Sequence, residues 1–174
     1  MNKRGQAAME FLMTYGWAIV VVLAAIGALA YFGVLSPQKL LPDRTTFTAP
    51  LPNVDNAVVT YSATAPTVQI AFKNNKGVAI TLPLTGTGTG NCNGALNMNN
   101  PGSTYTNSTG GQQQITAGVT QIQNGGSFLL TFTCPANPGA QVGSKFSADF
   151  TFPYVNYETS QTLSQTGSVD GKYS

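Results

Sequence analysis

The chain has 174 residues, which is enough for one membrane helix and one globular domain of about 130 residues. Only 8% of the residues are charged, against about 25% in an average soluble protein. Two of the eight basic side chains, Lys3 and Arg4, lie at the N-terminus, and the other six balance the six acidic side chains. The composition therefore gives no basic patch that would favour nucleic-acid binding. Because histidine, the commonest general base and metal ligand, is absent, the composition argues against an enzyme, a metal site or a cofactor.

The first predicted element is an apolar helix that follows a short basic start. No charged side chain occurs between Glu10 and Lys39, so about 28 residues, or roughly 42 Å of helix, are available to cross a hydrocarbon core of about 30 Å. The basic pair Lys3 and Arg4 predicts that the N-terminus stays in the cytoplasm and that the chain after Leu35 is exported.

Two kinds of export signal fit this segment. A conventional secretory signal is cleaved after the apolar run, behind a small-x-small triplet, and Ala28-Leu29-Ala30 supplies one. The block Lys3-Arg4-Gly5-Gln6-Ala7-Ala8-Met9-Glu10-Phe11-Leu12 resembles instead the leader of archaeal type IV pilins, the class III signal peptides. In that family a basic pair and Gly precede the cut, and Gln and Glu follow it. The match covers residues 1–35 and is specific at Arg4, Gly5, Gln6 and Glu10, whereas the family often has Ser in place of Ala8.

The resemblance implies cleavage between Gly5 and Gln6 by a prepilin peptidase, so that a leader of residues 1–5 is removed and a helix over residues 6–36 is kept. It implies a structural subunit of an archaeal type IV-like surface pilus, held in the cytoplasmic membrane as a precursor and mediating adhesion once assembled. The implied partners are identical subunits, the peptidase, an assembly ATPase and a membrane platform protein. A motility filament fits less well, because archaellin leaders continue differently after the cut.

Two features of the helix bear on its packing against copies of itself. Small residues let helix backbones approach closely, and the candidate contact positions are Gly16, Ala24, Gly27 and Ala28. Glu10 needs a partner, because a carboxylate inside lipid costs about 2.5–3.5 kcal/mol. The resemblance implies that this partner is the new amino terminus of Gln6 on an adjacent subunit. From chemistry alone, Glu10 could equally lie in the lipid headgroup region, or in the first turn of the helix, where the helix dipole favours a negative charge.

After the helix the pattern changes from helical to extended. Ser36 and Pro37 end the helix, and the prolines within residues 37–56 predict an extended connector. From residue 57 to residue 174 alternating apolar positions predict an all-β head domain. Thr67–Phe72 and Val78–Leu82 are expected to form a hairpin. Two further strands, Ser127–Cys134 and Lys145–Tyr154, each place their apolar residues on one face.

The expected fold class is α+β: a long hydrophobic helix followed by an immunoglobulin-like, two-sheet antiparallel sandwich, with a small barrel as the nearest alternative. Weaker strand candidates are residues 58–61, 112–123 and 159–169. The glycine-alternating run 85–91 and the stretch 97–111 are expected to be exposed polar loops. No Lys-Ser/Thr follows the glycine run, so it does not match a phosphate-binding loop.

Three further features concern the exported part. Cys92 and Cys134 are most simply one disulfide, and closing a loop of about 43 residues stabilises by roughly 4 kcal/mol in the chain-entropy model. Asn107 begins an Asn-Ser-Thr sequon, a candidate glycosylation site. A second functional hypothesis is a membrane-anchored binding module that uses the same leader and recognises sugars through exposed Tyr105, Tyr154 or Tyr157. The alternative for these tyrosines, which we favour, is that they are half-buried residues of strands.

Overall fold

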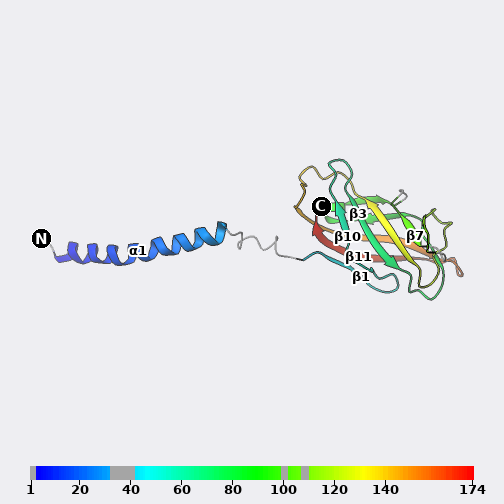
Figure 1. The fold of residues 1–174 in the computed structure, drawn as a ribbon, viewed down its shortest axis with the longest axis horizontal. Helices are drawn as coiled ribbons and strands as arrows, with labels where there is room; N and C mark the ends of the chain where they lie inside the picture. The colour runs from blue at the N-terminus through cyan, green and yellow to red at the C-terminus, as the bar shows by residue number, and fades with distance from the viewer. Residues whose placement is uncertain (1–2, 32–41, 99–101, 107–109) are drawn as a thin grey trace. The chain divides into compact units, whose positions relative to one another are not determined.

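The structure is a computed structural model that describes residues 3–31, 42–98, 102–106 and 110–174, with the backbone alone for residues 3–8 and 12. The chain divides into two compact units, Met1–Leu41 and Pro42–Ser174. Figure 1 shows a helix in the first unit and a strand-rich head in the second, and each unit is described by itself.

The first unit contains the helix α1, Lys3–Tyr31. Its segment Met9–Tyr31, 23 residues, is long and apolar enough to cross a membrane and none of it is buried within the chain. Near its start the hydroxyl of Thr14 is satisfied within the helix, because its Oγ1 donates to the carbonyl oxygen of Glu10 at 2.9 Å. The helix was expected over residues 6–36, and residues 32–36 lie outside the described part of the chain.

The head is built from short strands joined by turns. Their bounds are β1 Arg44–Phe47, β2 Val58–Thr60, β3 Thr67–Lys73, β4 Ile80–Thr81, β5 Thr85–Gly88, β6 Gly94–Asn97, β7 Thr104–Thr106, β8 Gln112–Gln114, β9 Ser127–Thr133, β10 Lys145–Asn156 and β11 Thr162–Lys172, with the short 3-10 helix η2 Gly90–Cys92 between β5 and β6. The strands belong to one sheet in the order β1-β11-β10-β5-β6-β9-β3-β2, with β4 on β10 and the β7–β8 pair on β9. All of these pairings are antiparallel.

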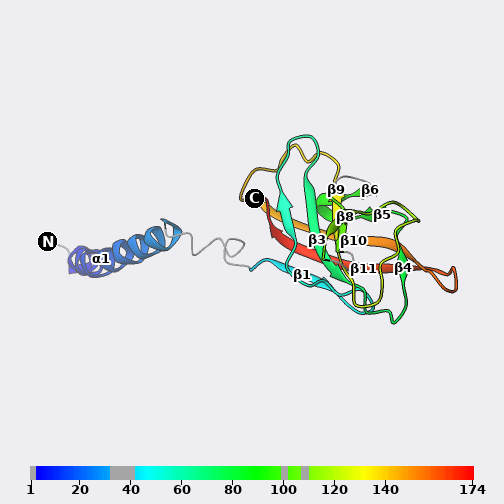
Figure 2. The ribbon, with the colours of Figure 1, turned by 45° about the vertical axis from the view of Figure 1, so that its right-hand side comes forward.

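The α+β class is therefore present, but the described strands form one connected sheet and not two separate ones. The turned view in Figure 2 shows β5 and β6 beside one another, and this hairpin joins the β1-β11-β10 part of the sheet to the β9-β3-β2 part. The sheet curls around one core, which is closer to the barrel alternative than to a sandwich of two independent sheets.

Hydrogen bonds link the first two strands of the sheet path, β1 and β11, to the last two, β3 and β2. The side chain of Asn53 accepts from the backbone N–H of Phe47 at 3.0 Å and donates to the carbonyl oxygen of Thr45 at 3.2 Å, both in β1. Its backbone bridges Phe72 in β3. The side chain of Asn53 thus satisfies backbone groups on the edge of β1 that does not pair with β11. After the end of β11, the N–H of Ser174 donates to the carbonyl oxygen of Val59 in β2 at 2.9 Å.

The core follows the predicted alternation. One face of each long strand is buried, as expected from the period of two, and the expected residues Val68, Ile70, Phe72, Phe128, Leu130, Phe132, Cys134, Phe146, Ala148, Phe150 and Phe152 are all buried. Phe72 lies at the centre, with its ring centroid 4.9 Å from that of Phe47, 5.5 Å from Phe128 and 5.3 Å from Phe152. Each such pair contributes about 0.5–1.5 kcal/mol beyond the area it buries.

The hairpin expected between Thr67–Phe72 and Val78–Leu82 is wrong. β3 pairs with β9 over its whole length, from Thr67 beside Thr133 to Lys73 beside Ser127, while β4 pairs with the end of β10. The β3–β9 pairing is preferred over the expected hairpin because β3 and β9 are both long and each buries the alternate residues that pack into the core. The chain turns after β3, but it turns away from the strand it has just left.

Three segments that were expected to be a connector or loops contribute strands. β1 lies within the expected connector 37–56 and pairs with β11 from Arg44 to Phe47, so the head begins earlier than residue 57. β5 lies within the glycine run expected as a loop, and β7 lies within the expected loop 97–111. At Gly88 an added Cβ would collide with the carbonyl oxygen of Cys92. Glycine therefore serves close packing here, not flexibility.

Candidate functional surfaces

The first candidate surface is the apolar side of α1. Its large side chains, Trp17 and Leu23 among them, are exposed, and an exposed apolar surface of this kind can contact lipid or other helices. Glu10 is exposed near its start. The bond between Gly5 and Gln6 lies in the first turns of the same helix, and the leader assignment of Lys3, Arg4, Gly5 and Gln6 stays a prediction.

The small residues of α1 leave room on its surface. Gly16 and Gly27 are separated by three helical turns and so lie on one line, and a Cβ added at either meets nothing within 4 Å. Ala24 and Ala28 are one turn apart on a neighbouring line and are exposed. A second helix can approach most closely along these lines.

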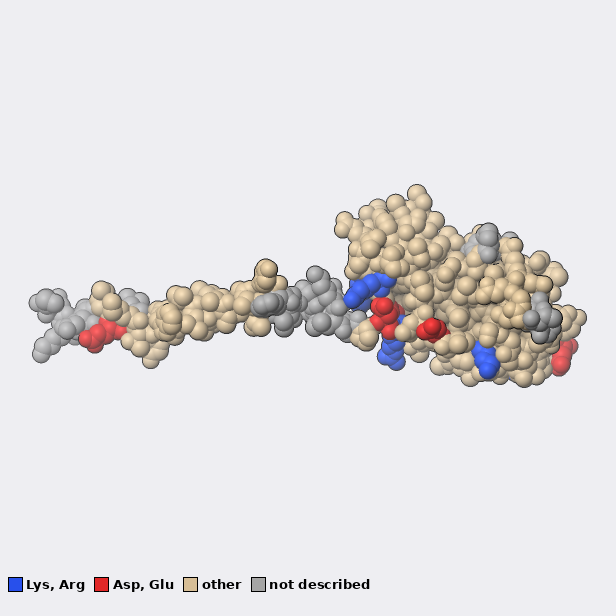
Figure 3. All heavy atoms as spheres, viewed as in Figure 1, with Lys and Arg blue, Asp and Glu red and all other residues tan. Residues whose placement is uncertain are grey.

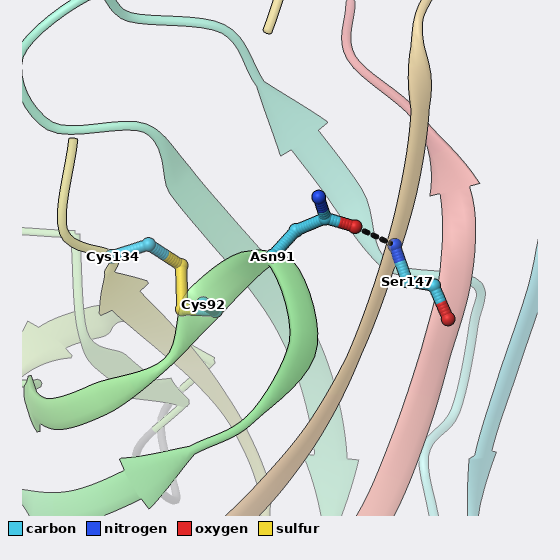
Figure 4. Close-up of a disulfide and its surroundings, with 4 residues drawn as sticks. All are labelled: Asn91, Cys92, Cys134 and Ser147. Carbon is cyan, nitrogen blue, oxygen red and sulfur yellow. Dashed lines mark hydrogen bonds between the residues drawn. A yellow bond between two sulfur atoms is a disulfide. The ribbon is translucent and has the colours of Figure 1, made fainter. Parts of the chain in front are cut away.

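The disulfide expected from the two cysteines is present. Cys92 and Cys134 are joined with their Cα atoms 4.9 Å apart, and both are buried. Figure 4 shows the pair at the turn between β5 and β6, with Asn91 directed toward β10. The Asn91 side-chain oxygen accepts from the N–H of Ser147 at 2.8 Å. The turn is thus fixed covalently on one side and by a hydrogen bond on the other.

The second candidate surface is a hollow of about 340 Å³ on the head. It is formed by β7 and by the turn that precedes β9, and its lining residues are Tyr105, Thr106, Gln121, Ile122, Gln123, Asn124 and Gly126. The turn is held in place by Asn124, whose side-chain oxygen accepts from the N–H of Gly77 at 3.0 Å, and by Ile122, which bridges Ile80. None of the lining residues carries a charge at neutral pH.

The hollow lies at the end of the head opposite to where the chain enters it. The chain enters at Pro42, and Arg44 lies beside Asp170 near the end of β11. The other end of β10 carries Asn156, which pairs with Ile80. Because Ile122 bridges Ile80, the segment that lines the hollow belongs to this far end.

The three tyrosines proposed as sugar contacts differ in how exposed they are to solvent. Tyr154 lies in β10 and is buried, with the Lys76 amine 5.9 Å from the centre of its ring, so the hypothesis of an exposed sugar contact at this residue is wrong. Tyr157 is exposed. Tyr105 is half-buried in the wall of the hollow. Asn107, the sequon asparagine, lies outside the described residues.

The head surface is nearly free of charge. Figure 3 shows few charged side chains on an otherwise neutral face, with acidic and basic ones side by side where the head begins. Within residues 42–174 five basic side chains balance five acidic ones. No group of three or more His, Cys, Asp or Glu that could hold a metal occurs among the described residues. The surface therefore offers hydrogen bonds and apolar contact in place of a strong field.

No family model matches the chain, and a search of curated proteins finds no significant match. The resemblance to pilins accordingly depends on residues 1–35.

Sequence reasoning missed most residues of the hollow. Tyr105 is among the predicted sugar contacts, but Gln121, Gln123 and Asn124 are not, because residues 112–123 are only a weak strand candidate and Asn124 lies just beyond them. The local signal was the polar run Gln121-Ile122-Gln123-Asn124 before two glycines. It marks a turn, and nothing in it indicates which strand the turn faces.

Proposed function

We propose that the chain is a structural subunit of an archaeal type IV-like surface pilus that polymerises through α1 and mediates adhesion through its head. The observation that carries the proposal is the exposed apolar segment Met9–Tyr31, in a unit separate from the head. At 1.5 Å per residue it is roughly 35 Å long, which spans a hydrocarbon core of about 30 Å. The same surface can exchange lipid for neighbouring helices when subunits assemble, with no large hydrophobic cost.

The pilin leader supplies the order of events. A prepilin peptidase would cut between Gly5 and Gln6, and an assembly ATPase with a membrane platform would extract the trimmed helix into the filament core. The new amine of Gln6 would then lie near Glu10 of a neighbouring copy, where the two opposite charges neutralise each other away from water. The disulfide-bonded β-sheet head would coat the outside of the filament.

The decisive test is the N-terminus of the chain in sheared surface filaments, measured by Edman sequencing or mass spectrometry. We expect it at Gln6, whereas a start at Tyr31 would establish a conventional secretory signal and overturn the proposal. Gly5→Leu should block trimming and abolish filaments, and Ala8→Ser, which introduces the residue common in the family, should be trimmed normally. Filaments formed by the Gly5→Leu variant would refute the processing step.

A second candidate function is a membrane-anchored binding module that keeps α1 in the bilayer and forms no long filament. The observation that favours it is the uncharged hollow on the head, which gives a single subunit a means of binding without polymerisation. Recovery of the chain only in the membrane fraction, with no filaments in sheared material, would select this function over the pilus.

A further inference from the structure

We infer that the hollow lined by Tyr105, Gln121, Gln123 and Asn124 binds a neutral oligosaccharide. The inference rests on the proposed adhesion function and gives it a site and a class of ligand. The volume of about 340 Å³ falls in the usual range for small-molecule sites, about 300–1,000 Å³. Its place at the end of the head opposite Pro42 leaves it away from the point where the chain is tethered.

The amide side chains provide the polar contacts. Gln121 and Gln123 are exposed, and their side chains make no hydrogen bond to other residues of the described chain. Each amide offers two N–H donors and a carbonyl acceptor, a set that matches the hydroxyl groups of a sugar, which both donate and accept. Asn124 has its oxygen engaged by Gly77 N–H, so its amino group is held in a fixed direction with its donors available.

The tyrosine provides the apolar contact. The hydroxyl of Tyr105 donates to the side-chain oxygen of Gln113 at 2.9 Å, and its backbone pairs with Phe128 in β9. The ring is therefore fixed before any ligand arrives, which lowers the entropy cost of binding. A sugar ring has an apolar face of C–H groups that packs against an aromatic ring, while its hydroxyls point to the amides around it.

The uncharged lining of the hollow favours neutral polar ligands over charged ones. A carboxylate or phosphate on the ligand would lose water on entering and would meet no cation in the lining. An uncharged polyol meets no such penalty. The groove of about 400 Å³ around Leu84 is a poorer candidate, because apart from Thr85 and Asn97 its walls are Pro, Leu and Ala side chains that cannot recognise hydroxyl groups.

The test is saturation-transfer NMR on the full chain in a phosphocholine detergent, since maltoside detergents would compete for the site. The probes are maltohexaose, cellohexaose, mannohexaose and chitohexaose, with oligogalacturonate as the charged comparison. We expect transfer to at least one neutral probe, with a dissociation constant on the order of 1 mM. The double variant Gln121→Ala/Gln123→Ala and the variant Tyr105→Leu should each weaken binding by about tenfold or more.

The matched control is Gln112→Ala/Gln114→Ala, which removes two exposed amides from β8 outside the hollow and should leave binding unchanged. Transfer to none of the neutral probes, equal weakening by the control, or binding of oligogalacturonate alone would overturn the inference. Unfolding midpoints of all variants show whether a loss reflects misfolding. Filaments whose chains begin at Gln6 but bind no sugar would remove this inference and leave the pilus intact. Binding without filaments would do the reverse.

Discussion

Asn74 is the buried amide that holds the turn after β3 together, and its removal should destabilise the head. Its side chain is fully buried. The side-chain nitrogen donates to the carbonyl oxygens of Val78 and Ile122, at 2.9 Å each, and the side-chain oxygen accepts from the N–H of Lys76 at 3.0 Å. These bonds join the turn after β3 to the segment that lines the hollow.

The cost of Asn74→Ala follows from these partners. Three hydrogen bonds at about 1 kcal/mol each give about 3 kcal/mol. The carbonyl oxygen of Ile122 keeps a second donor, the N–H of Ile80 at 3.0 Å, and Val78 and Lys76 are half-exposed and can turn to water. We therefore expect a loss of about 2–3 kcal/mol. Asn74→Asp keeps the acceptor but sets a carboxylate oxygen against two carbonyl oxygens, so it should cost more than alanine.

The assay is urea unfolding of the full chain in a phosphocholine detergent, followed by circular dichroism with the disulfide intact. Asn75→Ala is the matched control, because it makes the same change at the next residue, which is exposed, and it should change stability by less than about 0.5 kcal/mol. Equal losses for the two alanine variants, or an Asn74→Asp variant as stable as the Asn74→Ala variant, would refute the role given to this amide.

Three further results are expected. Replacing both Cys92 and Cys134 by Ala should lower unfolding free energy by up to about 4 kcal/mol in the chain-entropy model, and no change in the urea midpoint would contradict it. Gly88→Ala should cost about 1–3 kcal/mol because its Cβ meets the Cys92 carbonyl oxygen, whereas Gly139→Ala, at an open position, should be neutral in the same assay. Raising ionic strength from about 10 to about 150 mM should shift stability by less than about 0.5 kcal/mol, since the few charges of the head balance. A larger shift would reveal a coupled charge network.

Sequence reasoning succeeded where one strand determines its own pattern. Phe128, Leu130 and Phe132 had to share a face whatever lay beside them, because side chains alternate along any strand. Strand pairing depends on a partner elsewhere in the chain. β3 pairs with β9, more than fifty residues away, and not with the segment Val78–Leu82 that follows it. Local spacing contains no information about that choice.

Predictions from composition were wrong where a residue type that is common in loops lies in or beside a strand. Glycine and proline normally mark loops, yet Gly86 and Gly88 lie in β5, and β1 begins only two residues after Pro42. The hollow was beyond prediction for a related reason, since Tyr105 and Gln123 come from separate segments that only the folded sheet brings together. The disulfide was predictable because two cysteines leave a single choice of partner.

The place of β1 has a mechanical consequence. The strand follows the point of entry directly and runs antiparallel to β11, from Arg44 beside Asp170 to Phe47 beside Gly167. A pull on residue 42 along this strand, with the far end of the domain held by a surface, loads these pairs in shear, so that they share the force and do not peel apart one by one. Single-molecule extension along this axis should therefore need more force than extension across the sheet, as suits a tether.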